Sequence, residues 1–449
     1  MAAGKGTRMK SKLPKMLQPI CGKPMVGYVA DAIRNTGIND IYGVIPGNAD
    51  GFSQAFGYPI TLINQQYGTH GTGSAIYSSK DIIKQSIDNV LVINGDLPLI
   101  TPDTILMLME HHNSSGADIS LLTVKSIPTL DMGIVVKDAN NRITHIAEYD
   151  SDRQISDGEG NVGAYCFKTY SLGKAIAKLK PNKDGDYRIT DLIPMANNNS
   201  LRIGSVLVED CDQALGVNNG IDLSLVRNIM QKRINEKWLL NGVSIIEPVY
   251  IDESVQLSSD SIIYPNTFIM GNSEVGPNTT IGPNSVITDS FIGEYSKITQ
   301  SVVENAVLED SIDVGPYSHI RPDSYIESNV HIGNFAEIKN SRIGRGTQIG
   351  HFSYIGDSVV GIEVNIGAGV ITCNFDGLEK HRTSIGDRAF IGSDSLLVAP
   401  VNIGADASTG AGSVITKDVP DGATVIGMPA RKTPQKKAFQ DGKSNSLTT

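Results

Sequence analysis

The sequence predicts an α/β chain with two differently built halves, a doubly wound, Rossmann-like domain and a parallel β-helix of hexapeptide repeats. Three observations support this prediction. The chain begins with a glycine-rich basic loop, "MAAGKGTRMKSKLPK". Apolar runs and helical segments then alternate up to about residue 220. From residue 242 onward, Ile-Gly and Val-Gly pairs recur, often at six-residue intervals. We therefore expect domains at 1–220 and 242–430, a linking helix at 221–241 and a disordered tail at 431–449.

The first half contains apolar runs that predict buried strands. The run "NVLVINGD" (89–96) ends in Gly-Asp, and the segment after it has a capping threonine, Thr101, with Pro102 at the first helical position. Residues 117–126 predict a second buried strand, and residues 133–149 predict a hairpin. Because doubly wound sheets bind ligands at the carboxyl ends of their strands, we expect a ligand near the end of the first run.

Two helical segments carry residues whose position on the helix can be predicted. A stripe at four-residue intervals predicts the linking helix, and its members are Val226, Met230, Ile234 and Trp238. The helix after Pro102 carries His111 and His112, which we expect on a solvated face.

The second half has the period of a parallel β-helix, in which each coil stacks on its neighbours around a shared core. We expect roughly ten coils, at about three hexads per coil. The segment "CNFDGLEKHRTS" (373–384) interrupts the period and predicts a projecting loop. The aliphatic-Gly pairs start at Val275, Ile281, Ile292, Val314, Ile332, Ile343, Ile349, Ile355, Val360, Ile366, Ile385, Ile391 and Ile403.

Composition excludes several classes of protein. The chain has 449 residues, of which 40% are hydrophobic and 19% charged, and a net charge of −10. That charge argues against nucleic acid or an anionic membrane surface as a partner. The four cysteines form no CxxC pair, so neither a zinc site nor a disulfide framework is indicated. With no signal-like segment and no membrane-length apolar run, we expect a cytoplasmic enzyme.

The residues of the first half indicate phosphate chemistry. Small residues and glycines let the opening loop approach an anion, while Arg8 and Lys15 bring positive charge to it. Asp96 ends a strand, where its carboxylate could hold Mg²⁺ against substrate phosphates. Taken alone, Asp96 could equally cap the following helix or close a turn. Together, the loop and Asp96 favour a nucleoside triphosphate, a metal ion and phosphoryl or nucleotidyl transfer.

The second half brings other candidates together. The segment "IKNSRIGRGTQIGHFSYIGD" (338–357) places Lys339, His351 and Tyr354 within one coil's length. A histidine that opens a hexad is more often a surface or stacking residue. Arg321, Lys339 and Tyr354 are nevertheless candidates for binding a sugar phosphate beside it.

These motifs carry a resemblance that covers nearly the whole chain. The opening loop resembles the nucleotide loop of sugar-1-phosphate nucleotidyltransferases. The two-part layout is similar to the bacterial family of bifunctional N-acetylglucosamine-1-phosphate uridyltransferases and glucosamine-1-phosphate acetyltransferases. The motifs that carry the resemblance are "GTG" (71–73), "NGDLPL" (94–99), "AEYD" (147–150), "NVGAY" (161–165), "DYRITDL" (186–192), "GVNN" (216–219), "HFSYIGD" (351–357) and "TCNFDG" (372–377).

The resemblance implies an enzyme that acetylates glucosamine-1-phosphate with acetyl-CoA, then transfers uridylate from UTP to N-acetylglucosamine-1-phosphate. It implies Mg²⁺ on Asp96 and Asn218, and uracil contacts from Gln66, Gly71 and Thr72. The UTP phosphates would lie on the opening loop and Lys15, with Arg8 facing pyrophosphate. The implied contacts for UTP and UDP-N-acetylglucosamine are Ala2, Ala3, Gly4, Arg8, Lys15, Gln66, Gly71, Thr72, Asn94, Gly95, Asp96, Gly133, Glu148, Asn161 and Asn218.

For the second half, the resemblance implies a left-handed β-helix in a homotrimer, with His351 as the general base of acetyl transfer. Glucosamine-1-phosphate would contact Arg321, Lys339, Tyr354 and Asn365. The acetyl-CoA cleft between subunits would be lined by Ala368, Asn374, Phe375, Ser393 and Ala411.

Two alternatives remain open from sequence. The β-helix could be regulatory, in another sugar-1-phosphate nucleotidyltransferase, or it could be a trimerising scaffold beside an inactive first domain. The second alternative arises because such a phosphate loop normally follows a central strand. We expect an apolar strand of about five to eight residues before Met1 in a longer natural chain. A form without that strand would have a weakened uridyltransferase half and an unaffected β-helix.

Overall fold

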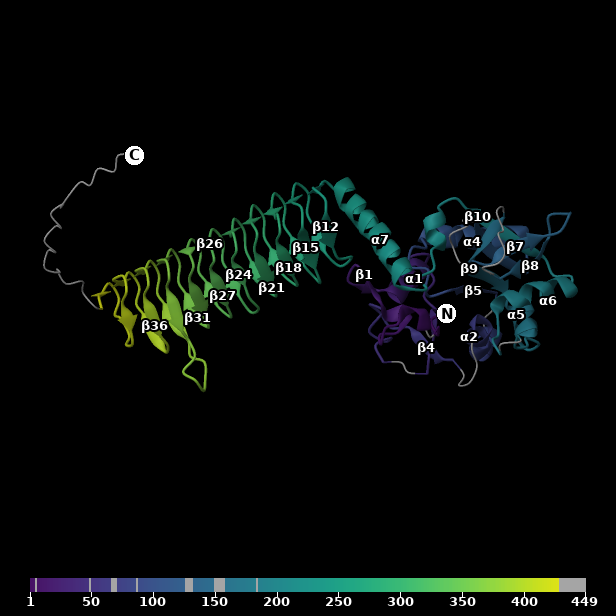
Figure 1. Cartoon of the computed structure of the whole chain (residues 1–449), viewed down its shortest axis with the longest axis horizontal. Coiled ribbons are helices and arrows are strands. Elements are labelled where there is room, and N and C mark those ends of the chain that lie inside the picture. Colours follow the sequence, from purple (N-terminus) through teal and green to yellow (C-terminus); the bar gives the residue numbers. More distant parts are fainter. Residues whose placement is uncertain are drawn as a thin grey trace, which may run out of the picture. The chain divides into compact units, whose positions relative to one another are not determined.

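The computed structural model describes residues 1–4, 6–47, 50–65, 71–85, 88–125, 132–148, 158–182 and 185–427 (Figure 1). Its contacts divide the chain into two compact units. The first comprises Met1–Leu240 and Tyr250–Val255, and the second comprises Asn241–Val249 and the residues from Gln256 onward. Strand β12 (Val249–Ile251) spans this division. No helix in these described ranges combines the length and the apolar character needed to cross a membrane.

The first unit is built from short strands and helices. Its helices and 3-10 turns are η1 (Thr7–Met9), η2 (Lys15–Leu17), α1 (Met25–Arg34), α2 (Thr72–Ser78), α3 (Lys80–Gln85), α4 (Pro102–Ser115), α5 (Thr169–Ile176), η3 (Ile189–Asp191), α6 (Leu192–Asn198), η4 (Cys211–Ala214) and α7 (Gly220–Leu240). Its strands are β1 (Pro19–Ile20), β2 (Lys23–Pro24), β3 (Tyr42–Ile45), β4 (Thr61–Asn64), β5 (Asn89–Ile93), β6 (Ile119–Lys125), β7 (Ile134–Lys137), β8 (Ile143–Ala147), β9 (Glu159–Lys168) and β10 (Ile203–Val208).

The main sheet has the order β10-β6-β9-β7-β8, and β5 also pairs with β9. Strands β10 and β6 are parallel, whereas β9 runs antiparallel to β5, β6 and β7. Successive residues of the central strands point to opposite faces, as a pleated strand requires. Thus Leu122 packs in one core cluster with Ile105 and Leu108 of α4, while Leu121 packs in the other with Leu172 of α5. Helices therefore cover both faces of the sheet.

Most of the elements predicted in this half are confirmed. The run that ends in Gly-Asp forms β5, residues 133–149 contain the β7–β8 hairpin, and the stripe of four apolar residues is buried along α7. The side chain of Thr101 accepts a hydrogen bond from Thr104 N at the start of α4. The prediction for His112 is wrong, because this side chain is buried and its Nδ1 lies 2.9 Å from Ser120 Oγ on β6.

The opening residues lie between two strands. Met1 N donates to Ile93 O of β5 at 2.7 Å, and Gly95 N donates back to Met1 O at 2.8 Å. On the other side, Ala2 N donates to Val44 O of β3 at 2.6 Å. The loop that follows is therefore tied to β5 and β3 through the backbone of Met1 and Ala2.

The second unit is a parallel β-helix whose strands stack in three sheets (Figure 1). The first sheet contains β11 (Ser244–Ile245), β14 (Ile262–Ile263), β17 (Thr280–Ile281), β20 (Lys297–Ile298), β23 (Asp313–Val314), β26 (His331–Asn334), β29 (Gln348–His351), β32 (Asn365–Ile366), β35 (Phe390–Ile391), β38 (Ser408–Thr409) and β40 (Thr424–Val425). The second contains β15 (Thr267–Met270), β18 (Val286–Thr288), β21 (Val302–Glu304), β24 (His319–Ile320), β27 (Glu337–Lys339), β30 (Tyr354–Gly356), β33 (Ile371–Cys373), β36 (Leu396–Val398) and β39 (Val414–Ile415). The third contains β13 (Gln256–Leu257), β16 (Glu274–Val275), β19 (Phe291–Ile292), β22 (Val307–Leu308), β25 (Tyr325–Ile326), β28 (Arg342–Ile343), β31 (Ser358–Val360), β34 (Thr383–Ile385) and β37 (Val401–Ile403).

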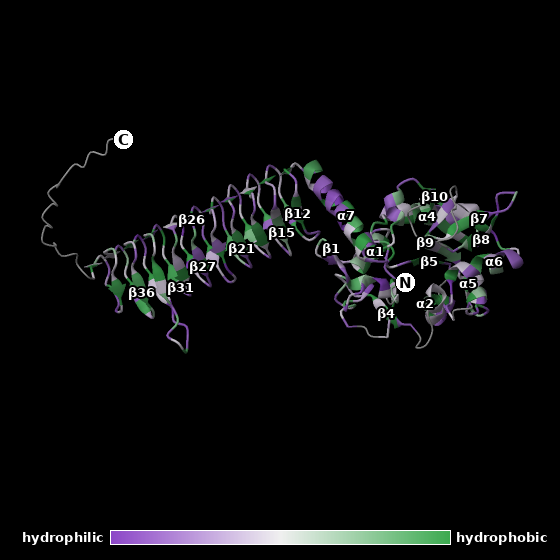
Figure 2. Cartoon of the chain, viewed as in Figure 1, coloured by the Kyte–Doolittle hydropathy of each residue, from purple (hydrophilic) through white to green (hydrophobic). Residues whose placement is uncertain are grey.

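The core of the β-helix is a set of aliphatic columns. In the second sheet, Ile320, Ile338 and Ile355 are paired in register and fully buried. Figure 2 shows hydrophobic and hydrophilic residues alternating along the coils, as inward and outward positions require. Buried corner hydroxyls also join the coils, since Ser296 N donates to Thr279 Oγ1 at 3.1 Å. The predicted hexapeptide period is therefore confirmed.

The predicted loop interrupts this stack. It connects β33 to β34, and Figure 1 shows it projecting from the coils. The register resumes beyond it, because Val360 pairs with Ile343 on one side and with Ile385 on the other. Within the loop, Phe375 and Lys380 form an isolated antiparallel bridge.

The buried columns generate a stability prediction. Ile298 is fully buried, whereas Val307 is 37% exposed. We expect Ile298→Ala to lower the free energy of unfolding of the β-helix by about 2–5 kcal/mol, because it opens a cavity between two coils. Val307→Ala is the matched control and is expected to have little effect. Chemical denaturation followed by circular dichroism tests this, and equal effects of the two substitutions would contradict it.

Candidate functional site

The opening loop places two cations beside two oxygen ligands. Lys15 Nζ lies 2.6 Å from Asp96 Oδ2 and 3.4 Å from Asn218 Oδ1. Arg8 also donates from its guanidinium to Asn218 Oδ1 at 3.0 Å. Residues far apart in the sequence thus converge at the end of β5, where the sequence predicts a ligand.

Backbone geometry explains how Lys15 reaches this place. Gly6 has a φ of +61°, and a Cβ at this position would lie 2.5 Å from Lys15 Cβ. Only glycine therefore fits here without a shift. The side chain of Lys15 is buried against the loop, with its ammonium directed to Asp96. Along the loop, Ala2 is buried, Ala3 is half-buried and Gly4 is exposed.

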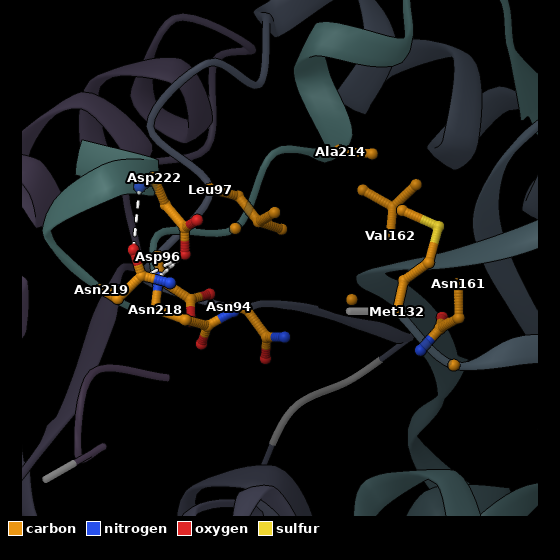
Figure 3. A pocket seen from close by; sticks show the side chains of 13 residues that line it. Asn94, Asp96, Leu97, Met132, Asn161, Val162, Ala214, Asn218, Asn219 and Asp222 are labelled. Carbon is orange, nitrogen blue, oxygen red and sulfur yellow. Dashed lines mark hydrogen bonds between the residues drawn. The ribbon is translucent and has the colours of Figure 1, made fainter. Parts of the chain in front are cut away.

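A cavity of about 340 Å³ opens beside this pair. In Figure 3, Asp96, Asn218 and Asp222 lie on one side of it and Asn161 and Met132 on the other. Its walls are formed by Asn94, Asp96, Leu97, Met132, Gly133, Asn161, Val162, Gly163, Ala214, Gly216, Asn218, Asn219 and Asp222. The structure therefore brings together the predicted candidates Asn94, Asp96, Gly133, Asn161 and Asn218.

Asn161 has an open acceptor in this cavity. Its Nδ2 donates to Tyr165 OH at 2.7 Å, but its buried Oδ1 has no hydrogen-bond partner within the described part of the chain. A buried carbonyl without a donor is costly unless a ligand or water supplies one. Gly163 lies close to Asn94, and a Cβ at Gly163 would clash with Asn94 Nδ2 at 2.3 Å.

A second group forms around residues 187–190. Gly71 has a φ of +88°, and a Cβ there would lie 2.2 Å from Tyr187 O. Thr72 Oγ1 accepts a hydrogen bond from Ile189 N at 3.0 Å, and Glu148 Oε1 accepts one from Thr190 Oγ1 at 2.7 Å. The candidates Gly71, Thr72 and Glu148 are thus linked through one segment. Gln66 lies outside the described residues, and Gly95 donates to the backbone of Met1.

Sequence reasoning missed Asp222. Its Oδ2 accepts hydrogen bonds from Asn218 N at 2.7 Å and Asn219 N at 3.1 Å, and so it holds the turn before α7. Asp222 N donates in return to Asn219 Oδ1 at 3.1 Å (Figure 3). This reciprocal arrangement is a capping box, and the spacing Asn-x-x-Asp at residues 219–222 is its detectable signal.

The donor set beside Lys15 is compatible with Mg²⁺. No group of three or more His, Cys, Asp or Glu side chains with metal-binding geometry occurs among the residues that the structure describes. Mg²⁺ needs no such group when phosphates and water supply its other ligands. The Asp96 carboxylate and the Asn218 amide oxygen already face one cation, the Lys15 ammonium. One carboxylate and one amide oxygen therefore fit a metal shared with a phosphate ligand.

The second unit presents another cationic group, on its second sheet. Arg321 follows β24 and Lys339 ends β27, and because Ile320 pairs with Ile338 the two lie on adjacent coils. Tyr354 lies on the next coil, opposite Glu337. Arg321 donates to Glu337 Oε1 at 2.6 Å, and this hydrogen bond raises the pKa of Arg321.

His351 lies on the adjoining first sheet, at the corner where the chain turns into the second sheet. It ends β29, is exposed, and its Nδ1 lies 3.2 Å from Asn334 Oδ1 on the preceding coil. Two residues separate it from Tyr354, which begins the neighbouring strand β30. The histidine therefore lies at the corner beside the second sheet, which carries Arg321 and Lys339.

The projecting loop adds Lys380, which sequence reasoning also missed. Contact with the Lys339 ammonium lowers the pKa of Lys380, because two like charges face each other. Asp376 shapes the loop by accepting from Leu378 N at 2.8 Å and by pairing with His381 Nε2 at 2.7 Å. Three cations thus gather where the loop leaves the sheet, an arrangement that favours a bound anion.

The remaining candidates form a column above His351. Ile349, Ile366, Ile391 and Thr409 are paired in register, so the residues two positions later are stacked; they are His351, Ala368, Ser393 and Ala411. Asn365 begins β32 and pairs with Gln348. Phe375 is 59% exposed on the loop, and Asn374 Nδ2 lies 3.3 Å from Tyr354 OH.

Comparison with known proteins agrees with the division into a nucleotidyltransferase-like first part and a hexapeptide-repeat second part. Residues 1–190 match the family described as "MobA-like NTP transferase domain", residues 254–289 match "Bacterial transferase hexapeptide (six repeats)" and residues 302–376 match "GMPPB C-terminal domain". The bifunctional protein GlmU of Thermosipho africanus is 42% identical over 95% of this chain and 93% of its own length. That of a Geobacillus species is 39% identical, with 95% and 94% covered. That of Shouchella clausii is 37% identical, with 95% of each chain covered.

Proposed function

The chain belongs to the family of bifunctional GlmU proteins, and from this premise we propose that it is a two-site transferase that makes UDP-N-acetylglucosamine from glucosamine-1-phosphate. One observation carries the proposal. Each compact unit has its own cation-lined site, Arg8 and Lys15 in the first and Arg321 and Lys339 in the second. Both sites suit phosphorylated substrates. We assign uridyltransferase activity to residues 1–220 and acetyltransferase activity to residues 242–430.

In the second unit, Arg321, Lys339 and Lys380 bind the phosphate of glucosamine-1-phosphate. Tyr354 and Asn365 hold the sugar, and its amine is directed to His351 at the corner between the first and second sheets. When His351 Nδ1 donates to Asn334 Oδ1, the lone pair remains on Nε2, where it can accept a proton.

The acetyl step forms a carbon–nitrogen bond and breaks a carbon–sulfur bond. The amine nitrogen attacks the thioester carbon of acetyl-CoA, His351 Nε2 takes a proton from the nitrogen, and the carbon–sulfur bond breaks to release coenzyme A. A base placed in this way is typically worth about 10²–10⁴ in rate. Acetyl-CoA follows the column above His351 and the base of the loop, with contacts at Ala368, Asn374, Phe375, Ser393 and Ala411.

In the first unit, the small residues Ala2, Ala3 and Gly4 and the ammonium of Lys15 hold the UTP phosphates, and Arg8 faces the departing pyrophosphate. An oxygen of the sugar phosphate attacks the α-phosphorus in line, and the bond to the β-phosphate oxygen breaks. Asp96 and Asn218 would hold Mg²⁺, which supplies charge neutralisation on the phosphates.

Further contacts hold the nucleotide base and the sugar. Gln66, Gly71 and Thr72 bind uracil. Asn161 offers its Oδ1 to the acetylated sugar, and the lack of a hydrogen-bond partner for this atom among the described residues is the main support for that contact. The other proposed contacts along the cavity and beside it are Asn94, Gly95, Gly133 and Glu148.

The alternative of a merely regulatory or scaffolding β-helix has less support. Such a β-helix has no need for three converging cations, an exposed histidine at the adjoining corner and a polar loop beside them. We propose that the protein is cytoplasmic and that it assembles as a homotrimer. The trimer is favoured because a cleft built from one sheet face and a projecting loop can be closed by the β-helix of a neighbouring copy.

The assignment of the base predicts a selective loss. We expect His351→Ala to lower acetyl transfer by about 10²–10⁴-fold and to leave uridylyl transfer from UTP unchanged. Release of free thiol from acetyl-CoA and release of pyrophosphate measure the two activities. His331→Ala, one coil earlier, is the matched control, because His331 pairs only with Asp313 in the contacts described for it. Thiol release within a few-fold of the parent would exclude His351 as the base.

The assignment of Mg²⁺ to Asp96 predicts that uridylyl transfer is lost while acetyl transfer is kept. Asp96→Asn is expected to lower Mg²⁺-dependent pyrophosphate release by about a hundredfold or more, since it removes the carboxylate beside the phosphates. Acetyl transfer should match the parent. Asp103→Asn on the exposed first turn of α4 is the control. A variant with the parent's Mg²⁺ dependence would refute a role for Asp96.

Assembly can be tested directly. We expect light scattering to give the mass of three chains in any preparation that acetylates glucosamine-1-phosphate. Acetyl transfer by a species with the mass of one chain would contradict the trimer.

A further inference from the structure

Asp357 occupies an unusual corner of the β-helix. It follows β30 with a φ of +50° and is only 5% exposed. Its backbone joins neighbouring segments, because Asp357 N donates to Lys339 O at 2.9 Å and Thr383 N donates to Asp357 O at 3.4 Å. Thr383 begins the strand after the projecting loop. Asp357 therefore touches the coil before it and the far stem of the loop.

The carboxylate of Asp357 is bonded by side chains from both directions. Asn340 Nδ2 donates to Oδ1 at 2.6 Å, Asn374 Nδ2 donates to Oδ2, and Lys339 Nζ lies 3.5 Å from Oδ2. Burial disfavours the charged carboxylate, but these hydrogen bonds and the charge of Lys339 outweigh burial and lower the pKa of Asp357. Asp357 is thus ionised and fully engaged at neutral pH.

The partners of Oδ2 belong to the proposed acetyl-transfer site. Lys339 is a proposed phosphate contact, and Asn374 bridges from Asp357 to Tyr354 OH at 3.3 Å. Asn374 is also the first residue after β33, where the loop departs. A carboxylate would itself repel a phosphate, so a buried position behind Lys339 lets it orient the ammonium without facing the substrate.

We propose that Asp357 is a positioning residue for sugar-phosphate binding, which holds the Lys339 ammonium and, through Asn374, the loop and Tyr354 in their binding arrangement. This inference rests on the acetyl-transfer function proposed above. Asp357 does not touch the substrate and acts only through these neighbours.

An isosteric change separates this role from simple packing. In Asp357→Asn, one acceptor becomes an NH₂ donor of nearly the same size. If the new NH₂ group faces Asn374 and Lys339, it meets two other hydrogen-bond donors. If the amide is flipped, the NH₂ group faces the Nδ2 donor of Asn340 instead. Either orientation loses hydrogen bonds that the carboxylate makes, and both orientations remove the charge that Lys339 faces.

The experiment is steady-state acetyl transfer by the full-length protein. We expect Asp357→Asn to raise the KM for glucosamine-1-phosphate roughly 10–100-fold, as the loss of a supporting partner commonly does, while kcat changes much less. Asn340→Ala is the matched variant, because it removes the bond to Oδ1 and leaves both Oδ2 partners in place. Asp323→Asn, at an exposed corner with a φ of +64°, controls for the substitution itself.

The outcomes are distinct. A KM within about twofold of the parent, or an equal rise in Asn340→Ala, would overturn the positioning role. Circular dichroism, light scattering and pyrophosphate release check that each variant is folded. If Asp357→Asn does not fold, Asp357→Glu is measured instead; its longer carboxylate displaces Lys339 and Asn374, so an unchanged KM would also overturn the role. A parent protein that fails to acetylate glucosamine-1-phosphate would overturn the proposed function itself.

Discussion

The second unit depends on one constraint, the parallel register between successive coils. Backbone hydrogen bonds such as Glu337 N to Ser353 O and Tyr354 N to Val370 O repeat from coil to coil at about the same length, 2.9 Å. Each coil therefore places its outward side chains directly over those of the coil below. A slip by one residue would turn the buried isoleucines outward, so the register is strongly specified. The proposed acetyl-transfer site depends on this register, because its side chains come from adjacent coils.

Features that follow from local period or local turn chemistry could be predicted from sequence. The six-residue spacing was enough to predict the aliphatic columns and the point where the loop leaves them. Resemblance to a family predicts Arg321, Lys339 and His351 in one site; the structure places the two cations on the second sheet and His351 at the adjoining corner of the first. In the first unit, the Gly-Asp end of β5 and the Thr101 cap were predicted for the same reason, since each depends on neighbours in sequence.

Features that depend on contacts between distant segments could not be predicted. His112 is buried because α4 packs on β6, where Ser120 meets its ring, and helical spacing alone does not reveal which strand lies beneath a helix. Lys380 meets Lys339 only because the loop folds back, which its irregular sequence does not encode in any period. The convergence of Lys15 with Asn218 likewise needs the folded sheet. Asp222 differs from these, because its capping-box spacing was visible and was overlooked.

The stacked coils also space their outward side chains at regular intervals. Neighbouring strands are about 4.8 Å apart, so Arg321 and Lys339 present their charges at a fixed interval along the helix axis. The same column continues to Glu304 below, because Val303 pairs with Ile320, and to Gly356 above, where it offers first a negative charge and then no side chain. An anion displaced by one step therefore meets repulsion in one direction and lost attraction in the other. Such a surface can select a ligand by the position of its negative charge, even though no single side chain is specific for that ligand.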